Sequence, residues 1–243
     1  MPKSNARARA SVDASQSDSA FDLLREQIIA GRFEPGAKLR IEQLCAQYDV
    51  GASPMREALS RLAETNLVVF EPQRGYWVAP ISIEEYRDLV GMRVRLESQA
   101  LAESIHNGDL EWEAQVVAAF HRLSHAHKQL STGTDEAFAN WVREDRAFHM
   151  TTLSRCKSKW LLHFCRLIQD QLARYHRAQH LTGIDPGAVN QQEHARLLDA
   201  VLSRDVDFAV KTFTNHVSSV AQRVAPGTAA RGRERPARTR RRA

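Results

Sequence analysis

The feature that most constrains the fold is the stretch from residue 50 to residue 80, where a short amphipathic helix leads directly into two β-rich runs. In "VGASPMREALSRLAETNLV", Met55, Ala58, Leu59 and Leu62 recur at helical spacing and predict an inward apolar stripe. The following "LVVFEPQRGYWVAP" places two β-rich runs on either side of a Pro-Gln-Arg-Gly turn, which is typical of a hairpin. Together they favour a winged helix-turn-helix.

The start of that helix is basic and turned away from the stripe. Ser53 suits the N-cap, and Pro54 suits the first turn because its missing N–H costs nothing there. In a helix-turn-helix the first turn of the second helix enters the major groove, and a helix N-terminus also favours phosphate. The candidate DNA contacts, including the wing tip, are Arg40, Ser53, Pro54, Arg56, Arg61, Arg74 and Gly75. The alternative is a winged helix used for protein contact, with Arg56 as an ordinary surface residue.

Two further short helices complete the predicted N-terminal domain, residues 18–80. One runs from about Ser19 to Gly31, and the other covers residues 40–48, with "FEPGAKL" as a turn between them. Residues 1–17 are small and polar, and we expect them to be disordered.

From Ser82 onward the pattern is helical throughout, so the fold class is mainly α. Ser82 and Glu85 form a capping box. We expect six helices, which form an all-α bundle over residues 82–222: 82–106, 109–130, 135–155, 158–180, 187–203 and 205–222. Residues 223–243 read as a basic, disordered tail.

The net charge of +5 belongs to the two ends of the chain. Residues 224–243 carry +6 and residues 1–17 carry +2, which leaves −3 for residues 18–223. Nucleic-acid binding must therefore be argued from the placement of individual residues. The three cysteines form no C-x-x-C pair, and no apolar run is long enough for a membrane span. We expect a cytoplasmic protein that associates with the nucleoid and not with a membrane.

Four ionisable residues of the helical region fall on apolar stripes. Asp145 and His149 are stacked four apart on the stripe of helix 135–155, while His194 and His216 lie on the stripes of the last two helices. Burying them unpaired would be costly. One Asp and three His could hold a divalent transition metal, or Asp145 and His149 could simply hydrogen-bond each other. The pairs His121/His125 and His176/His180 lie off their stripes and read as solvated.

The N-terminal motifs carry a family resemblance. "LLREQIIAGRFEPGAKL" and "SPMREALSRLAETNLVVFEPQRGYWV" resemble the DNA-binding domain of the GntR family of bacterial transcription regulators, over about residues 20–80. Many members carry Ser-Arg-Thr before the proline, whereas this chain has Gly51-Ala52-Ser53. The family's arginine falls at Ala52, so one DNA contact is absent and the operator sequence cannot be transferred from relatives.

The helical region is similar to the FCD effector domain of the FadR subfamily, and six helices suggest its VanR-like branch. The resemblance rests on "EDRAFHMTTL", "EHARLLDAVLSRDVDFAV" and "FTNHV". It implies that Asp145, His149, His194 and His216 hold a metal, with Zn or Ni favoured by the imidazoles. It also implies that Arg93 binds a small carboxylate effector, although an inward Arg93 could equally pair with Glu97. Gln171 and Tyr175, expected on the inner face of helix 158–180, could shape specificity, whereas Trp112 and Trp160 read as core.

The favoured interpretation is a homodimeric transcription regulator and not an enzyme. More specifically, we expect a repressor that binds double-stranded operator DNA. Two alternatives stay open. One is a metal-dependent hydrolase with a DNA-binding appendage, for which neither Glu144 nor Glu97 is clearly placed as a general base. The other is a regulator whose metal is purely structural.

Overall fold

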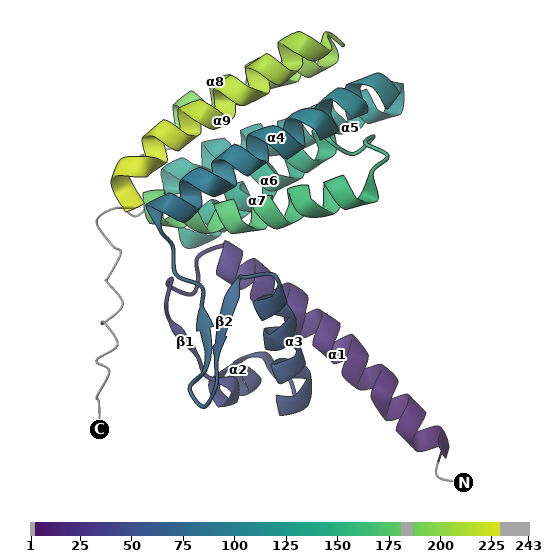
Figure 1. Ribbon diagram of the computed structural model, residues 1–243, viewed down its shortest axis with the longest axis vertical. Helices are drawn as coiled ribbons and strands as arrows, with labels where there is room; N and C mark the ends of the chain where they lie inside the picture. The colour runs from purple at the N-terminus through teal and green to yellow at the C-terminus, as the bar shows by residue number, and fades with distance from the viewer. Residues whose placement is uncertain (1–2, 181–186, 229–243) are drawn as a thin grey trace, which may run out of the picture.

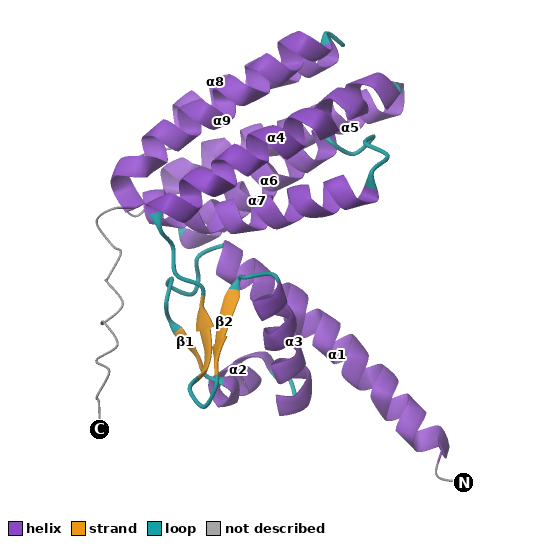
Figure 2. Ribbon diagram, in the orientation of Figure 1, coloured by secondary structure: helices purple, strands orange, loops and turns teal. Residues whose placement is uncertain are grey.

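A computed structural model describes residues 3–180 and 187–228, and the side chains of residues 16–176 and 190–222 within them. The chain forms a small N-terminal domain with a three-stranded sheet and a larger all-helical domain (Figure 1). Colouring by secondary structure shows that the described strands all lie in the N-terminal domain (Figure 2). The predicted mainly-α class, with a winged helix followed by a helical bundle, is confirmed.

The N-terminal domain contains three helices and the sheet. Leu24, Met55, Leu59, Leu62 and Val78 lie at the centre of its apolar core. Strand β3 pairs antiparallel with β1 on one side and with β2 on the other, with Tyr76 opposite both Leu39 and Phe70. The elements are α1 (Lys3–Ile29), β1 (Lys38–Leu39), α2 (Ile41–Tyr48), α3 (Ala52–Glu64), β2 (Val68–Glu71) and β3 (Gly75–Val78).

Two local expectations about this domain were wrong. Helix α1 begins at Lys3 and not near Ser19, so residues 3–17 are helical where disorder was expected. The segment is rich in alanine and arginine and has neither Gly nor Pro between Lys3 and Ile29, so nothing in it interrupts a helix. Lys38 and Leu39, expected within a turn, form the short strand β1, because their extended backbone pairs with the free edge of β3.

Six α-helices form the described part of the C-terminal domain, the number that the sequence predicts. Polar N-caps set where several begin: Ser82 accepts from the Glu85 N–H at 3.0 Å, Asp109 from Trp112 at 2.8 Å, and Thr134 from Ala137 at 3.2 Å. The helices are α4 (Ile83–Asn107), α5 (Leu110–Gln129), α6 (Asp135–Thr152), α7 (Lys159–His180), α8 (Gly187–Leu202) and α9 (Val206–Thr228). Helix α9 thus extends beyond the expected end at residue 222.

Helix α7 joins the two domains. Asp170 accepts two hydrogen bonds of 2.7 Å from Arg25 of α1 and is also bound by Arg146 of α6. The next residue, Gln171, donates from Nε2 to the Thr65 carbonyl at 2.5 Å. Further along the same helix, Arg174 donates to the Ala79 carbonyl at 3.1 Å. The N-terminal domain is therefore held against one helix of the bundle. No helix in the described ranges is long and apolar enough to cross a membrane.

Candidate metal centre and DNA interface

A cluster of buried polar residues lies inside the helical domain. Asp145 and His149 come from α6, His194 from α8 and His216 from α9, and each is at most 6% exposed. Asp145 and His149 are buried together with Phe138, Trp141, Val142 and Leu153, because i, i+4 spacing places them on the same face of α6. The structure thus brings together the four residues that the stripes single out.

The side chains of this cluster meet at one point. The Nε2 atoms of His149 and His194 are 3.2 Å apart, and His194 Nε2 lies 3.2 Å from Asp145 Oδ1. One ring nitrogen from each of His149, His194 and His216 lies within 4.8 Å of the others. His216 Nδ1 contacts Glu193 at 3.0 Å, which orients its ring as a carboxylate commonly orients a metal-binding imidazole.

Burial controls the charge of these groups. Burial, with a further contribution from the Arg93 charge, holds the pKa of His149 well below its usual range. Burial and the neighbouring His194 lower the pKa of His216 to about 4. Burial alone would raise the pKa of Asp145, but its hydrogen bond to His194 and the nearby His149 overcome it and hold that pKa well below the usual range. His149 and His216 are thus neutral and Asp145 is ionised, as metal ligands must be.

The residues present fit a transition metal. Nδ1 of His149 and Nδ1 of His194 are both buried without a hydrogen-bond partner in the described part of the chain, so these rings are not explained as ordinary hydrogen-bonded core histidines. Three imidazoles and one carboxylate form the N/O donor set that Zn or Ni accepts.

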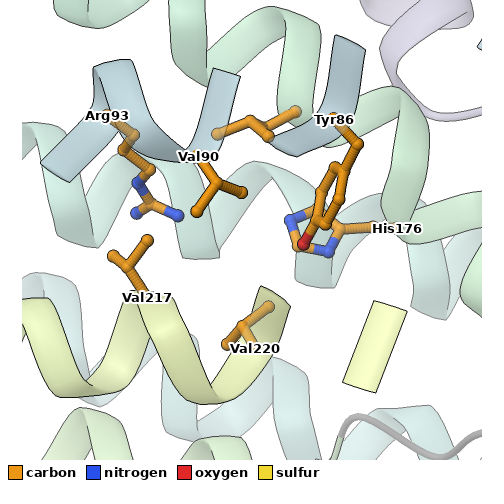
Figure 3. A pocket seen from close by; sticks show the side chains of 7 residues that line it. Tyr86, Val90, Arg93, His176, Val217 and Val220 are labelled. Carbon is orange, nitrogen blue, oxygen red and sulfur yellow. The ribbon is translucent and has the colours of Figure 1, made fainter. Parts of the chain in front are cut away.

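A small cavity of about 10 Å³ lies between α4, α7 and α9. Its volume corresponds to about one water molecule. Figure 3 shows Arg93 and Val217 at one end, Tyr86 and His176 at the other, and Val90 and Val220 between them. Two of its lining residues act electrostatically on the imidazole cluster, Arg93 on His149 and His176 with Asp145 and His194, so the cavity lies near that cluster.

Arg93 forms an ion pair through one nitrogen of its guanidinium and leaves another nitrogen without a partner among the described residues. Its Nε donates to Glu97 Oε2 at 3.2 Å, and the two side chains are 6% and 1% exposed. The alternative in which Arg93 pairs with Glu97 is therefore realised. Its Nη2, however, is buried with no hydrogen-bond partner among the described residues, and the side chain lines the cavity. The guanidinium can accept a further anionic partner.

Gln171 and Tyr175 are buried on the inner face of α7, as expected, but neither lines the cavity. Gln171 does not face it, since it donates to Thr65 of the N-terminal domain. Tyr175 is buried against the start of α4, where its hydroxyl bonds Glu85 and accepts from the Ser82 N–H. Both point elsewhere because the inner face of α7 is shared between the cavity and the domain interface. Conversely, His176, expected to be solvated, lines the cavity next to Trp141, and burial lowers its pKa.

Two buried residues near the cluster were missed. His127 of α5 lies with its ring centre 5.7 Å from that of His194 and accepts from Trp141 Nε1 at 3.4 Å. It continues the α5 stripe of Trp112, Val116, Ala119 and Leu123, so periodicity could have found it. Gln169 of α7 donates to Glu97 Oε1 at 2.9 Å, and no signal short of the three-dimensional packing marks this contact.

The start of α3 presents one free arginine. The N-cap is Gly51 and not Ser53, because the helix begins at Ala52; Pro54 is buried and supports the turn from inside. Ser53 and Arg56 are exposed, and Arg56 has no ion-pair partner in the part of the chain that the structure describes. Arg61 instead pairs with Asp18 at 2.7 Å and packs over Phe21, so the structure places it against α1.

The wing presents a second basic edge. Arg74 is 68% exposed, although its Nη1 lies 2.5 Å from Glu71 Oε2. Gly75 has φ of +94°, and nothing lies within 4 Å of where a Cβ would be, so glycine is required by the backbone and not by crowding. Arg40, also exposed, is the N-cap residue of α2. Both Lys38 and Arg74 lie over the ring of Trp77, with Lys38 Nζ 5.3 Å and Arg74 Cζ 5.6 Å from the ring centre.

These features define the class of protein: a winged-helix DNA-binding domain attached to a helical domain with a buried polar site. Comparison with known families agrees. Residues 16–78 match the family described as "Bacterial regulatory proteins, gntR family", and residues 88–219 match the "FCD domain". The chain belongs to the GntR family of transcription regulators, with a C-terminal FCD domain.

Curated relatives and solved structures support this assignment. The chain is 37% identical over 204 residues to the uncharacterized HTH-type transcriptional regulator BphR of Paraburkholderia xenovorans (strain LB400), covering 83% of this chain and 82% of BphR. It is 32% identical over 197 residues to the HTH-type transcriptional repressor GlaR of Escherichia coli (strain K12), covering 80% and 89%. The structure of E. coli McbR/YncC shares the fold, with a TM-score of 0.75 at 19% identity, over 87% of this chain and 97% of that one.

Proposed function

We propose that this protein is a homodimeric transcriptional repressor whose affinity for operator DNA is controlled by a small organic acid bound at a metal. One observation carries the proposal: three buried imidazoles and Asp145 converge beside Arg93, whose Nη2 has no partner among the described residues. The relative GlaR, which is named as a repressor, supports the sign of the regulation. Repression takes place on DNA, in the cytoplasm and at the nucleoid.

The sensor site would work from two sides. Asp145, His149, His194 and His216 would hold Zn or Ni, which when bound supplies a Lewis-acidic position for a carboxylate oxygen. Arg93 Nη2 would donate to the same carboxylate, adding a charge-assisted hydrogen bond. Val90, Val217 and Val220 would contact the apolar part of the acid after the cavity, about 10 Å³ as it stands, has widened.

The proposed DNA-contacting surface, called the reading head below, consists of the start of α3 and the wing with the start of α2. Ser53 and Arg56, at the start of α3, would enter the major groove of double-stranded DNA, while Arg74 and Gly75 of the wing and Arg40 of α2 would contact the flanking backbone. Because Pro54 and Arg61 are engaged within the protein, we assign them supporting roles.

An exposed aromatic patch on α7 supports the homodimer. Trp160 and Phe164 are 73% and 47% exposed, and their rings stack with centres 6.2 Å apart. Aromatic side chains of this size at a surface are typical of interface cores, and a two-fold axis would place the patch against its own copy. Trp160, expected in the core, is instead exposed. Sedimentation should give a dimer for the wild type and a shift toward monomer for Trp160→Ser.

The hydrolase alternative gains no support from the carboxylates. Glu144 contacts Arg122 at 3.4 Å and Arg143 at 3.1 Å, and Glu97 is bound by Arg93 and Gln169. Both are therefore engaged by other side chains, and neither is free to activate a water at the cluster.

The proposal is tested by metal analysis combined with DNA release. Protein purified without chelators or nickel resin should contain about one transition-metal ion per chain. Fluorescence anisotropy with operator DNA, selected from random duplexes, should then show release by at least one carboxylate in a panel, from metal-loaded protein only. Metal-free wild-type protein would contradict the site, and equal release from stripped protein would leave the metal a structural role.

A further inference from the structure

Glu97 binds the same guanidinium, that of Arg93, that the proposed function assigns to the effector carboxylate. We propose that Glu97 is a built-in carboxylate that competes with the effector for Arg93, and that its displacement is passed to the DNA-binding domain through Gln169. This inference rests on the proposed function, because it concerns the regulation of the same site. It assigns Glu97 and Gln169 as positioning residues.

The Arg93–Glu97 pair is an incomplete match. Glu97 takes only Nε of the guanidinium, at 3.2 Å, and leaves Nη2 buried without a partner among the described residues. A carboxylate can engage two guanidinium nitrogens at once, which gives a stronger and more specific contact than a single bond. An incoming acid that bonds Nη2 and then Nε would satisfy a donor that Glu97 leaves unsatisfied.

The cavity is too small for an acid to enter without displacing something. Its volume, about 10 Å³, is about that of one water probe. Apart from Arg93, its lining residues are Tyr86, Val90, Leu172, His176, Val217 and Val220. Among these lining residues, Arg93 is the one whose side chain carries a permanent positive charge. An acid can bind there only if the groups around Arg93 move. The Glu97 carboxylate, which contacts Arg93, carries the same negative charge as the incoming acid, so it is the group that we expect the acid to displace.

Gln169 connects this exchange to the domain interface. Its Nε2 donates to Glu97 Oε1 at 2.9 Å, and both side chains are almost fully buried. The next two residues of α7 hold the DNA-binding domain: Asp170 binds Arg25 and Gln171 binds the Thr65 carbonyl. Of three consecutive residues of α7, Gln169 therefore contacts the proposed sensor site, and Asp170 and Gln171 contact the DNA-binding domain. A carboxylate that leaves Arg93 must break or carry with it the bond to Gln169, at the position where α7 contacts α1.

The test uses full-length, metal-loaded protein with isobutyrate, benzoate and glutarate as probes. Binding is measured by calorimetry without DNA, and release by anisotropy with operator DNA. Glu97→Gln keeps the shape and the Gln169 contact but removes the competing charge, so probe affinity should rise about tenfold, the difference between a charged and a neutral hydrogen bond. Gln169→Leu should bind the probe within about threefold of wild type, yet need at least about tenfold more of it to release DNA.

Glu103→Gln is the matched control, because Glu103 lies on the same helix but contacts Cys156 and Lys157. It should leave both affinities unchanged. Equal or weaker probe binding by Glu97→Gln, relative to wild type, overturns the competition. Unchanged DNA release by Gln169→Leu overturns the transmission. If neither the wild type nor Glu97→Gln binds any probe, the effector assignment fails and the competition with it.

Hydrogen exchange on the wild type keeps the proposal testable if Glu97→Gln does not fold. Addition of the binding probe should speed amide exchange in α7 around residues 165–176, where the Gln169 bond breaks. Protection changes confined to α4 and α9 would overturn the proposed route.

Discussion

The two domains hold their polar functional groups in opposite ways. In the DNA-binding domain Arg56 and Arg74 project into solvent, where each can be replaced without disturbing the core. In the helical domain Asp145, His149, His194 and His216 are at most 6% exposed, where an unsatisfied polar group costs free energy. The exposed arginines of the DNA-binding domain should therefore be replaceable with little loss of stability, whereas the buried polar cluster should contribute to the stability of the bundle.

Removing the metal should have the largest effect. An ion that binds the folded chain at a concentration of about 1,000 times its Kd stabilises it by about 4 kcal/mol, and stripping the ion removes this stabilisation. Dialysis against a chelator should lower the melting temperature of the helical domain, measured by calorimetry, and His194→Ala should do so with loss of the metal. His121→Ala, at an exposed histidine of α5, is the control. Identical melting of loaded and stripped protein would remove the distinction between the domains.

The same contrast explains what could be predicted from the sequence. Asp145 and His149 were found because a polar residue on an apolar stripe is improbable unless something compensates for its burial. The winged helix followed from local signals, such as the turn before Gly75 and the stripe of α3. Gln171 and Tyr175 are buried on the inner face of α7, as expected, but neither lines the cavity, because that face packs against both the cavity and the other domain. Which residues of α7 face the cavity and which face the other domain depends on how the domains dock. The periodicity of a single helix does not contain this information.

The second prediction concerns the contact between the two regions. Asp170 is 8% exposed and is bound by Arg25 and Arg146, which are 20% and 14% exposed. Asp170→Ala should remove the most buried partner of two partly buried arginines, which keep only the half-exposed Glu26, and cost about 2–3 kcal/mol, less than for fully buried pairs. Urea unfolding followed by fluorescence should show it, with the two domains beginning to unfold separately. Asp88→Ala, exposed on α4, should change little, and an equal loss in both variants would refute a specific role for Asp170.

The third prediction compares two arginines of α3. Arg56→Ala should weaken operator binding by about 1–3 kcal/mol, the cost of removing a base contact, without changing the free energy of unfolding. Arg61→Ala should do the reverse on a smaller scale: it removes an exposed pair with Asp18, about 0.2–1 kcal/mol of stability, and keeps its operator affinity. Anisotropy titrations at one salt concentration measure operator affinity, and urea unfolding measures stability. An Arg61→Ala variant that loses more operator affinity than Arg56→Ala would show that the reading surface is wrongly placed.

The smallest expected effect tests whether the basic C-terminal segment belongs to the reading head. Residues 229–243, outside the described part of the chain, contain seven arginines and one glutamate, a composition that attracts phosphate without reading bases. Deleting them after Thr228, the last residue of α9, should reduce the slope of log K against log salt by about 0.9 for each phosphate that the segment had neutralised. Specific and non-specific duplexes should lose affinity alike, since both present the same backbone, so the ratio of the two affinities should stay constant. A fall in that ratio would mean that the segment contacts bases, and arginines outside the two domains would then contribute to specificity.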